Sequence, residues 1–264
     1  LQWHTSGKSA LNSVIEGKAD FAETAENPIM RAVLAGNDIS VITTIGSSEK
    51  NLAVIARKDA GISIAEDLKG KKIGVTVGTN GEFFMDSLLL VHRIREDQIK
   101  VVHLAPEEMF DALIKGQVDA VSTWNPYLAR LQKDLSNKGV TFYGKGIYTW
   151  TWNIVSMQEF AYKNPETVRK LLRALVKAEK IARNDKDAAQ EIVSEYLQID
   201  KPLLNTLWDI LDFKVVLNQT LLMTLEDQTR WAMTKGLTDK KRVPNYLNYI
   251  YIDALDKVKP EAVT

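Results

Sequence analysis

The chain has 264 residues, and its 34 basic residues balance 34 acidic ones without a single cysteine. Balanced charge, and no basic stripe with interleaved aromatic residues, argue against nucleic acid as a partner. The lack of cysteine excludes disulfide bonds, cysteine-ligated metals and thiol nucleophiles. No apolar run reaches the roughly 18 residues that a membrane span needs, and the length suits two α/β lobes of roughly 100–150 residues each.

The chain begins with Leu1-Gln2-Trp3-His4, which is typical of the middle of a strand. Neither a leader peptide nor a lipid-attachment cysteine precedes it. We therefore expect that an N-terminal segment is missing, together with any site residues that it carries.

The next feature along the chain is an internal sequence repeat, called the echo below. Residues 17–24, Gly-Lys-Ala-Asp-Phe-Ala-Glu-Thr, lead to Asn27-Pro28, and residues 116–123, Gly-Gln-Val-Asp-Ala-Val-Ser-Thr, lead to Asn125-Pro126. An amphipathic helix is predicted before each copy, at 9–16 and 107–115, and the glycine ends it because glycine adopts the left-handed cap conformation. Two copies in the same register predict two lobes of one design, with one loop on each side of a cleft.

Short apolar strands alternate with helices through the first 143 residues. This alternation predicts mostly parallel sheets that helices cover on both faces, with ligands bound beyond the carboxyl ends of the strands. The further strands are predicted at 39–45, 52–56, 72–77, 99–103 and 140–143, and the helices between them at 28–35, 82–95 and 126–137.

From Asn164 onward the pattern becomes helical and strands nearly disappear. Asn164 is a predicted N-cap, and an apolar stripe follows it at Val168, Leu171, Leu172, Leu175 and Val176. Further helices are predicted at 188–196, 201–211, 225–235 and 244–258. We expect this helical tail to pack on the first lobe.

Two glycine-containing loops each precede a helix and are candidate anion sites. Residues 78–82 follow a strand, and residues 6–9 hold the equivalent place in the first lobe. Backbone N–H groups at a helix N-terminus attract carboxylate, sulfonate, phosphate or nitrate, although ordinary helix capping explains the same residues. Residues 78–82 lack both the Walker A ending and the full dinucleotide fingerprint. The candidates are Ser6, Gly7, Lys8, Ser9, Gly78, Thr79, Asn80, Gly81 and Glu82.

The echo loops supply the second set of candidates. Glu23 and Glu26 carry negative charge close to a site suited to an anion, where like charges raise the cost of binding. Either the ligand carries an amine or at least one glutamate points to solvent. The candidates from these loops are Glu23, Thr24, Glu26, Asn27, Trp124 and Asn125.

Trp150 and Trp152 alternate on one predicted strand and so share a face, where they either stack on a ligand or pack in the core. The three histidines, His4, His92 and His103, lie on separate elements without metal-ligand spacing. We therefore predict no metal site, no cofactor and no catalytic residue. General acid/base hydrolysis lacks a second acid placed opposite Glu23 and Glu26.

An ordered set of motifs resembles the nitrate, sulfonate, taurine and thiamine-precursor (NMT1/THI5-like) group of periplasmic solute-binding proteins of ABC importers. The set covers about two thirds of the chain. Its members are residues 6–11 (SGKSAL), 17–21 (GKADF), 55–59 (IARKD), 67–75 (DLKGKKIGV), 116–120 (GQVDA) and 164–166 (NPE).

The resemblance implies a two-lobed α/β fold of the periplasmic-binding-protein type with two hinge crossings. Lobe one would comprise residues 1–56 plus 150–264, with the helical tail packed on it, and lobe two residues 57–149. It further implies a monomer that captures a small organic anion or zwitterion by closing its hinge and delivers it to a membrane permease. Its location would be periplasmic or otherwise extracytoplasmic, with a lipid anchor as one form of attachment.

Two other functions remain open at this point. The same module serves as the ligand-sensing domain of membrane signalling receptors, and full gene length would separate that case. The fold also hosts enzymes. Two such families depend on cysteine, which this chain lacks, whereas the menaquinone-pathway type would need a histidine in the cleft.

Overall fold

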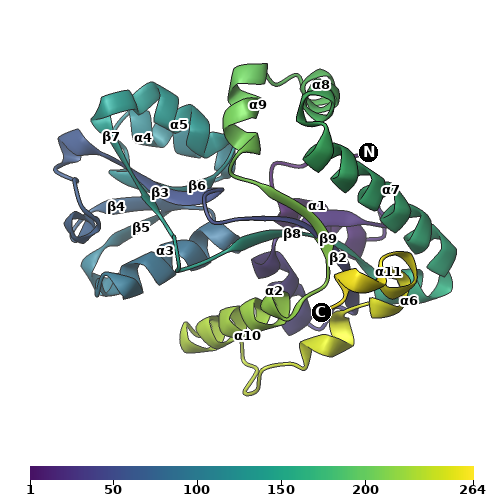
Figure 1. Cartoon of the computed structure of the whole chain (residues 1–264). Coiled ribbons are helices and arrows are strands. Elements are labelled where there is room, and N and C mark those ends of the chain that lie inside the picture. The colour runs from purple at the N-terminus through teal and green to yellow at the C-terminus, as the bar shows by residue number, and fades with distance from the viewer. The chain divides into compact units, whose positions relative to one another are not determined.

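The computed structural model describes all 264 residues, and the chain divides into two compact units. Unit 1 comprises Leu1–Ser47, Thr151–Asn205 and Asp212–Thr264, and unit 2 comprises Ser48–Trp150 and Thr206–Leu211. Each unit is built on one sheet with helices against it (Figure 1). The mixed α/β class predicted from the sequence is confirmed. None of the helices is long and apolar enough to cross a membrane.

Unit 1 contains a four-stranded sheet in the order β1-β8-β2-β9. Its strands are β1 (Ala22–Thr24), β2 (Ile39–Ser48), β8 (Trp150–Met157) and β9 (Asp212–Val216). Its helices are α1 (Gly7–Ile15), α2 (Glu26–Leu34), α6 (Gln158–Lys163), α7 (Pro165–Asn184), α8 (Lys186–Leu197), α10 (Gln219–Thr234) and α11 (Ile252–Val258), and α9 (Lys201–Trp208) runs from unit 1 into unit 2.

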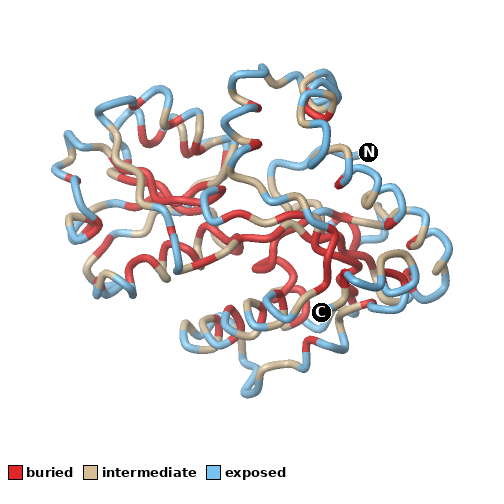
Figure 2. The backbone as a smooth tube through the Cα atoms, viewed as in Figure 1, coloured by how far each residue is buried: buried red, intermediate tan, exposed pale blue.

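The core of unit 1 joins segments that are far apart in the sequence. Ile39 and Val41 of β2, Val168 and Leu172 of α7, and Leu225 of α10 belong to one buried cluster. The predicted apolar stripe of α7 therefore faces this core, and Figure 2 shows buried residues gathered along the strands while the outer helix faces stay exposed.

A buried ion pair fastens α7 to the C-terminal segment of unit 1. Lys259 Nζ donates to Glu179 Oε1 and Oε2 at 3.0 and 2.7 Å and to the carbonyl of Val215 at 3.1 Å. The Glu179 side chain is 8% exposed and that of Lys259 is 17% exposed. The pair links α7, the end of α11 and β9 within one hydrogen-bonded cluster.

Tyr246 provides a second buried polar contact in unit 1. Its hydroxyl lies 2.5 Å from Thr229 Oγ1 of α10, and burial raises the pKa of Tyr246 to about 12. Because the folded state holds this proton more tightly than the unfolded chain, the stabilisation is complete below about pH 10 and is lost as pH rises toward 12.

Tyr246→Phe is expected to lower the free energy of unfolding by about 1 kcal/mol at neutral pH, because Thr229 Oγ1 loses the hydrogen bond to the phenol and keeps only the one to the carbonyl of Leu225. It should also flatten the decline in stability between pH 10 and 11.5, which urea unfolding at a series of pH values measures. An unchanged alkaline slope would contradict the assignment.

Unit 2 contains a five-stranded sheet in the order β5-β4-β6-β3-β7. The helix α3 contacts β3, β4 and β6, while α4 and α5 pack on the sheet from the opposite side (Figure 1). Its strands are β3 (Leu52–Arg57), β4 (Lys72–Val75), β5 (Lys100–His103), β6 (Ala120–Trp124) and β7 (Gly139–Tyr143), and its helices are α3 (Asn80–Val91), α4 (Met109–Ile114) and α5 (Tyr127–Leu135).

The echo is confirmed as helix, glycine cap and strand. Gly17 and Gly116 have φ of 71° and 70°, and each cap closes onto the preceding helix, at α1 and α4. β1 and β6 follow. The copies diverge at Asn-Pro, because Pro28 lies inside the first turn of α2, whereas the Asn125-Pro126 bond is cis and α5 begins after it.

The prediction of mostly parallel sheets is wrong. In unit 2 only β4–β5 and β4–β6 are parallel, and β3 pairs antiparallel with both β6 and β7. The helix α5 joins β6 and β7 in the same direction, but β3 is inserted between them. In unit 1, β1–β8 and β2–β9 are antiparallel.

One local prediction fails, one strand was missed, and one predicted helix cap holds its position without the expected side-chain hydrogen bond. Residues 1–4 form no strand, and Trp3 instead packs against Tyr196 with ring centroids 5.6 Å apart. β9 was not predicted, although Asp212 to Val215 alternate polar and apolar residues and their burial alternates with them. Asn164 precedes α7 but its side chain makes no cap bond, since its Nδ2 donates to the carbonyl of Phe160 at the end of α6.

Candidate functional site

The first turn of α1 is the most tightly built candidate in unit 1. Ser6 caps the helix, with its Oγ accepting from Ser9 N at 3.3 Å. A Cβ added to Gly7 would lie 2.7 Å from Thr24 Oγ1 and 2.8 Å from Thr24 Cα, so glycine is required for α1 to approach β1. The structure thus brings together Gly7 and Thr24, two candidates that the sequence analysis had named from separate loops.

The Thr24 hydroxyl is unusual among these contacts. Thr24 is fully buried, and its Oγ1 has no hydrogen-bond partner in the chain. An unpaired buried hydroxyl costs free energy, and such groups in native proteins call for a ligand, a water or a functional reason. This hydroxyl lies at the positive end of a helix, so the pair favours a bound oxygen anion.

Lys8 and Ser9 are placed differently from Gly7. Lys8 is exposed, and Ser9 Oγ lies 2.7 Å from His4 Nδ1. Asn27 is fully buried in the first turn of α2, where its Oδ1 accepts from Arg31 Nε at 2.9 Å. Asn27 therefore contributes to the local fold of α2.

Glu26 belongs to a buried polar network. Its Oε1 accepts from both Thr151 N and Thr151 Oγ1 at 2.6 Å, and Asn153 Nδ2 donates to Thr151 Oγ1 at 2.9 Å. Thr44 Oγ1 then donates to Asn153 Oδ1 at 2.7 Å. The carboxylate of Glu26 thus fastens α2 to the start of β8, which a reading of the loop alone does not reveal.

Glu23 has the opposite character. Its side chain is accessible to solvent on β1, opposite Ile154 in the register with β8. The surrounding protein nevertheless removes enough hydration to raise the pKa of Glu23 to about 7. The two glutamates of the echo loop are therefore separated by environment, one bound within the fold and one accessible.

In unit 2, the predicted loops meet at the carboxyl ends of the parallel strands β4 and β6. Ser122 Oγ donates to the carbonyl of Gly81 at 2.7 Å, and a Cβ on Gly81 would lie 3.6 Å from the Trp124 ring. Residues 78–82 and Trp124 are thus neighbours within one unit, at the edge where such sheets bind ligands.

Several donors of the loop at 78–82 are already engaged. Gly78 N donates to Glu82 Oε2 at 2.7 Å, and Gly81 N donates to Thr79 Oγ1 at 3.2 Å. Thr79 Oγ1 in turn donates to the carbonyl of Thr76 at 2.7 Å. Helix capping accounts for these contacts, so fewer backbone donors remain for a ligand than the sequence suggested.

Tyr148 is a site residue that sequence reasoning missed. Asn80 Nδ2 donates to its hydroxyl, and its ring meets Phe83 edge-on with centroids 5.4 Å apart. It lies 68 residues from Asn80 along the chain, so no local pattern links them. The tyrosine in Tyr148-Thr149-Trp150, next to the noted tryptophans, was the available signal.

The remaining candidates, Asn125 and three tryptophans, differ in their contacts and burial. Asn125 Oδ1 accepts from Ala129 N at 3.1 Å and caps α5. Trp124 meets Tyr127 edge-on at 6.1 Å. Trp150 is buried in β8, whereas Trp152 is half-buried and lies against Gly46.

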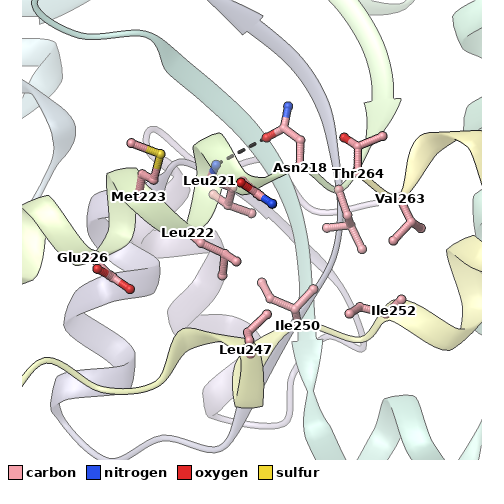
Figure 3. Close-up of a pocket in the computed structure, with 12 residues that line it drawn as sticks. Asn218, Leu221, Leu222, Met223, Glu226, Leu247, Ile250, Ile252, Val263 and Thr264 are labelled. Carbon is pink, nitrogen blue, oxygen red and sulfur yellow. Dashed lines mark hydrogen bonds between the residues drawn. The ribbon is translucent and has the colours of Figure 1, made fainter.

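Two cavities within unit 1 have no predicted site residue in their lining. One of about 410 Å³ lies between α10 and the C-terminal segment, where Leu222, Leu247, Ile250 and Val263 converge (Figure 3). A second, of about 520 Å³, includes Arg31 and Lys240. No group of three or more His, Asp or Glu residues is arranged to hold a metal ion.

The fold is shared with solved periplasmic binding proteins. The alkanesulfonate-binding protein SsuA from Xanthomonas axonopodis, bound to MOPS, superposes with a TM-score of 0.82 at 17% identity, covering 94% of this chain and 86% of that one. The desulfurization enzyme DSZB also shares the fold, with a TM-score of 0.63 at 16% identity over 92% of this chain and 86% of that one. The α/β fold of the periplasmic-binding-protein type predicted from the sequence is confirmed.

The match to family models is more specific than the fold. Residues 2–189 match the model described as NMT1/THI5 like, and the chain belongs to this family. Relatives include a putative aliphatic sulfonates-binding protein of Bacillus subtilis, 24% identical over 89% of this chain and 71% of that protein. The taurine-binding periplasmic protein of Escherichia coli is 26% identical over 66% of this chain and 54% of that protein.

Proposed function

We propose that the chain is an extracytoplasmic solute-binding protein that captures a small organic anion or zwitterion and passes it to an ABC permease. Family membership supports a binding role, and the relatives named above bind sulfonates and taurine. The observation that carries the proposal is the unpaired Thr24 hydroxyl at the first turn of α1.

We further propose that residues 1–56 plus 150–264 form one lobe, residues 57–149 form the other, and the protein closes by a hinge as a monomer. The division into compact units supports two lobes, with boundaries at 48 and 150. The absence of cysteine, as in the sequence argument, favours binding without catalysis. A sulfur-processing enzyme remains the second candidate because DSZB shares the fold.

The substitution Thr24→Val tests the anion site directly, because it removes the hydroxyl and keeps the shape of the side chain. We expect the affinity for taurine or 1-propanesulfonate, measured by calorimetry, to fall about tenfold, since one hydrogen bond to a charged oxygen is lost. The unliganded protein should keep its stability or gain slightly, because the buried hydroxyl had no partner to lose.

Thr229→Val is the matched control. Thr229 is equally buried, but its hydroxyl donates to the carbonyl of Leu225 at 2.8 Å and contacts Tyr246. This variant should lose stability and keep its affinity. If Thr24→Val destabilised the unliganded protein while leaving affinity unchanged, the hydroxyl would be structural and the site assignment wrong. Turnover of a sulfinate or sulfonate would favour the enzyme.

A further inference from the structure

We propose that the exposed face of α7 is a contact surface for anionic lipid headgroups, through a row of basic side chains. The row, called the α7 basic row below, consists of Lys170, Arg173, Lys177 and Lys180. None of these residues is a candidate for solute binding, so this inference is independent of the proposed function.

The α7 basic row occupies the side of the helix that faces away from the core of unit 1. Its members are three or four residues apart, so they lie within roughly 80° of one another around the helix axis and span about 15 Å along it. All four are exposed, whereas Val168 and Leu172 on the other side of α7 are buried. Figure 2 shows exposed residues along the outer side of this long helix.

Positive charge is concentrated on α7, although the basic and acidic residues of the whole chain balance. The acidic residues of α7 are Glu166 and Glu179 alone, and Glu179 is buried against Lys259. Glu166 is exposed, but it pairs with Arg169 and lies 3.8 Å from Arg173. Negative charge therefore offsets the row only at its N-terminal end.

The three lysines of the row form no ion pair within the chain. Exposed lysines on other helices do, since Lys115 on α4 and Lys163 on α6 each pair with an acid four residues earlier. Around Lys177 and Lys180, the residues one turn away on α7 are uncharged or basic. The helices α8 and α11 pack against α7, and none of their acids forms an ion pair with the row.

The arrangement of the row has a cost in the isolated protein. Like charges three or four residues apart on a helix repel and weaken it. The attraction of a helix C-terminus for cations explains Arg183 in the last turn, but it does not extend to Lys170 or Arg173. A layer of anionic groups beside α7 would turn this repulsion into a net attraction.

The chemistry of the face favours lipid headgroups over a protein partner. No large apolar side chain of α7 is exposed, and the exposed residues between the basic ones include Thr167, Ala174 and Ala178. Protein interfaces draw most of their affinity from buried aromatic and apolar anchors, which this face lacks. Anionic headgroups need only basic side chains close to the bilayer surface, because the attraction is electrostatic.

Vesicle sedimentation with the whole chain tests this inference. We expect the unmodified protein to bind vesicles of equal parts phosphatidylglycerol and phosphatidylcholine at about 20 mM salt and to dissociate at about 500 mM salt. Vesicles of phosphatidylcholine alone should leave it unbound. The variant Lys170→Gln/Lys177→Gln/Lys180→Gln should bind the anionic vesicles at least about 30-fold more weakly, since each basic residue near such a surface contributes about a factor of five.

Two further variants separate the position of the charges from their number and from the fold. Lys240→Gln/Lys241→Gln/Arg242→Gln removes the same charge from an exposed segment of unit 1 and should bind within about threefold of the unmodified protein. Lys170→Arg/Lys177→Arg/Lys180→Arg keeps the charge of the row and should bind as the unmodified protein does.

Three outcomes would overturn the role of the α7 basic row. They are an equal loss of vesicle binding when the charges at 240–242 are removed, unchanged binding in the glutamine variant of the row, and capture of the protein by soluble polyglutamate without binding to the vesicles. The last would identify an acidic protein as the partner. The affinity for taurine should be the same in all these variants, so its absence throughout would count against the proposed function alone.

Discussion

Replacing Glu179 by alanine is expected to lower the free energy of unfolding by about 3 kcal/mol, because it leaves the Lys259 ammonium buried without its counter-charge. Lys259 then retains only the carbonyl of Val215, at 3.1 Å. The cluster joins α7 to β9 and the end of α11, so the loss should loosen the helical tail of unit 1. Urea unfolding followed by far-ultraviolet circular dichroism measures the change.

The double variant Glu179→Met/Lys259→Met is the informative control. Removing both charges and filling the space with apolar groups should recover most of the lost stability, since buried pairs pay a desolvation cost that apolar side chains avoid. Arg183 lies 3.6 Å from Glu179, so Lys259→Met alone should cost less than Glu179→Ala. Equal losses in all three variants would show that packing, and not charge pairing, matters here.

The second large effect is expected from Gly7→Ala, which should weaken solute binding by roughly 100-fold, a loss of about 2.7 kcal/mol. The added methyl group would lie 2.8 Å from a backbone atom, Thr24 Cα, which cannot rotate away. Either α1 or β1 must shift, and the first turn of α1 would leave its position beside the Thr24 hydroxyl. Calorimetry with taurine and 1-propanesulfonate measures the affinity.

Gly17→Ala separates this steric effect from a general loss of stability. Gly17 lies at the other end of the same helix, and a Cβ there would meet nothing within 4 Å. Its φ of 71° strains alanine by about 1 kcal/mol, so stability should fall while affinity stays within about twofold. A comparable loss of affinity in both variants would contradict the proposed role of Gly7.

Local sequence patterns predicted much of this fold because its signals are local. The glycine caps at 17 and 116 require only a left-handed residue after an amphipathic helix, and both are present. Strand direction depends instead on which strands become neighbours. The antiparallel β3 between β6 and β7 is a long-range arrangement that no window of the sequence contains.

The candidate sites show the same limit at the level of side chains. Gly7 and Thr24 could be named as candidates from their residue types and local patterns, and their contact appears only in the structure. The structural role of Glu26 could not be predicted from local sequence, because its hydrogen-bond partner Thr151 is 125 residues away. Tyr148 was overlooked for the same reason, since its partner Asn80 comes from a distant helix.

The network of Glu26, Thr151, Asn153 and Thr44 has a practical consequence for redesign. Its hydrogen bonds connect α2, β8 and β2 through buried groups. Changing any one of the four residues would leave the buried polar groups of its partners without a hydrogen bond, because water does not reach them. Efforts to retarget the protein to a new solute should hold these four residues constant and diversify Glu23 and Trp124. A mutant library built in this way would keep the buried hydrogen-bonded network intact while the candidate solute-binding side chains vary.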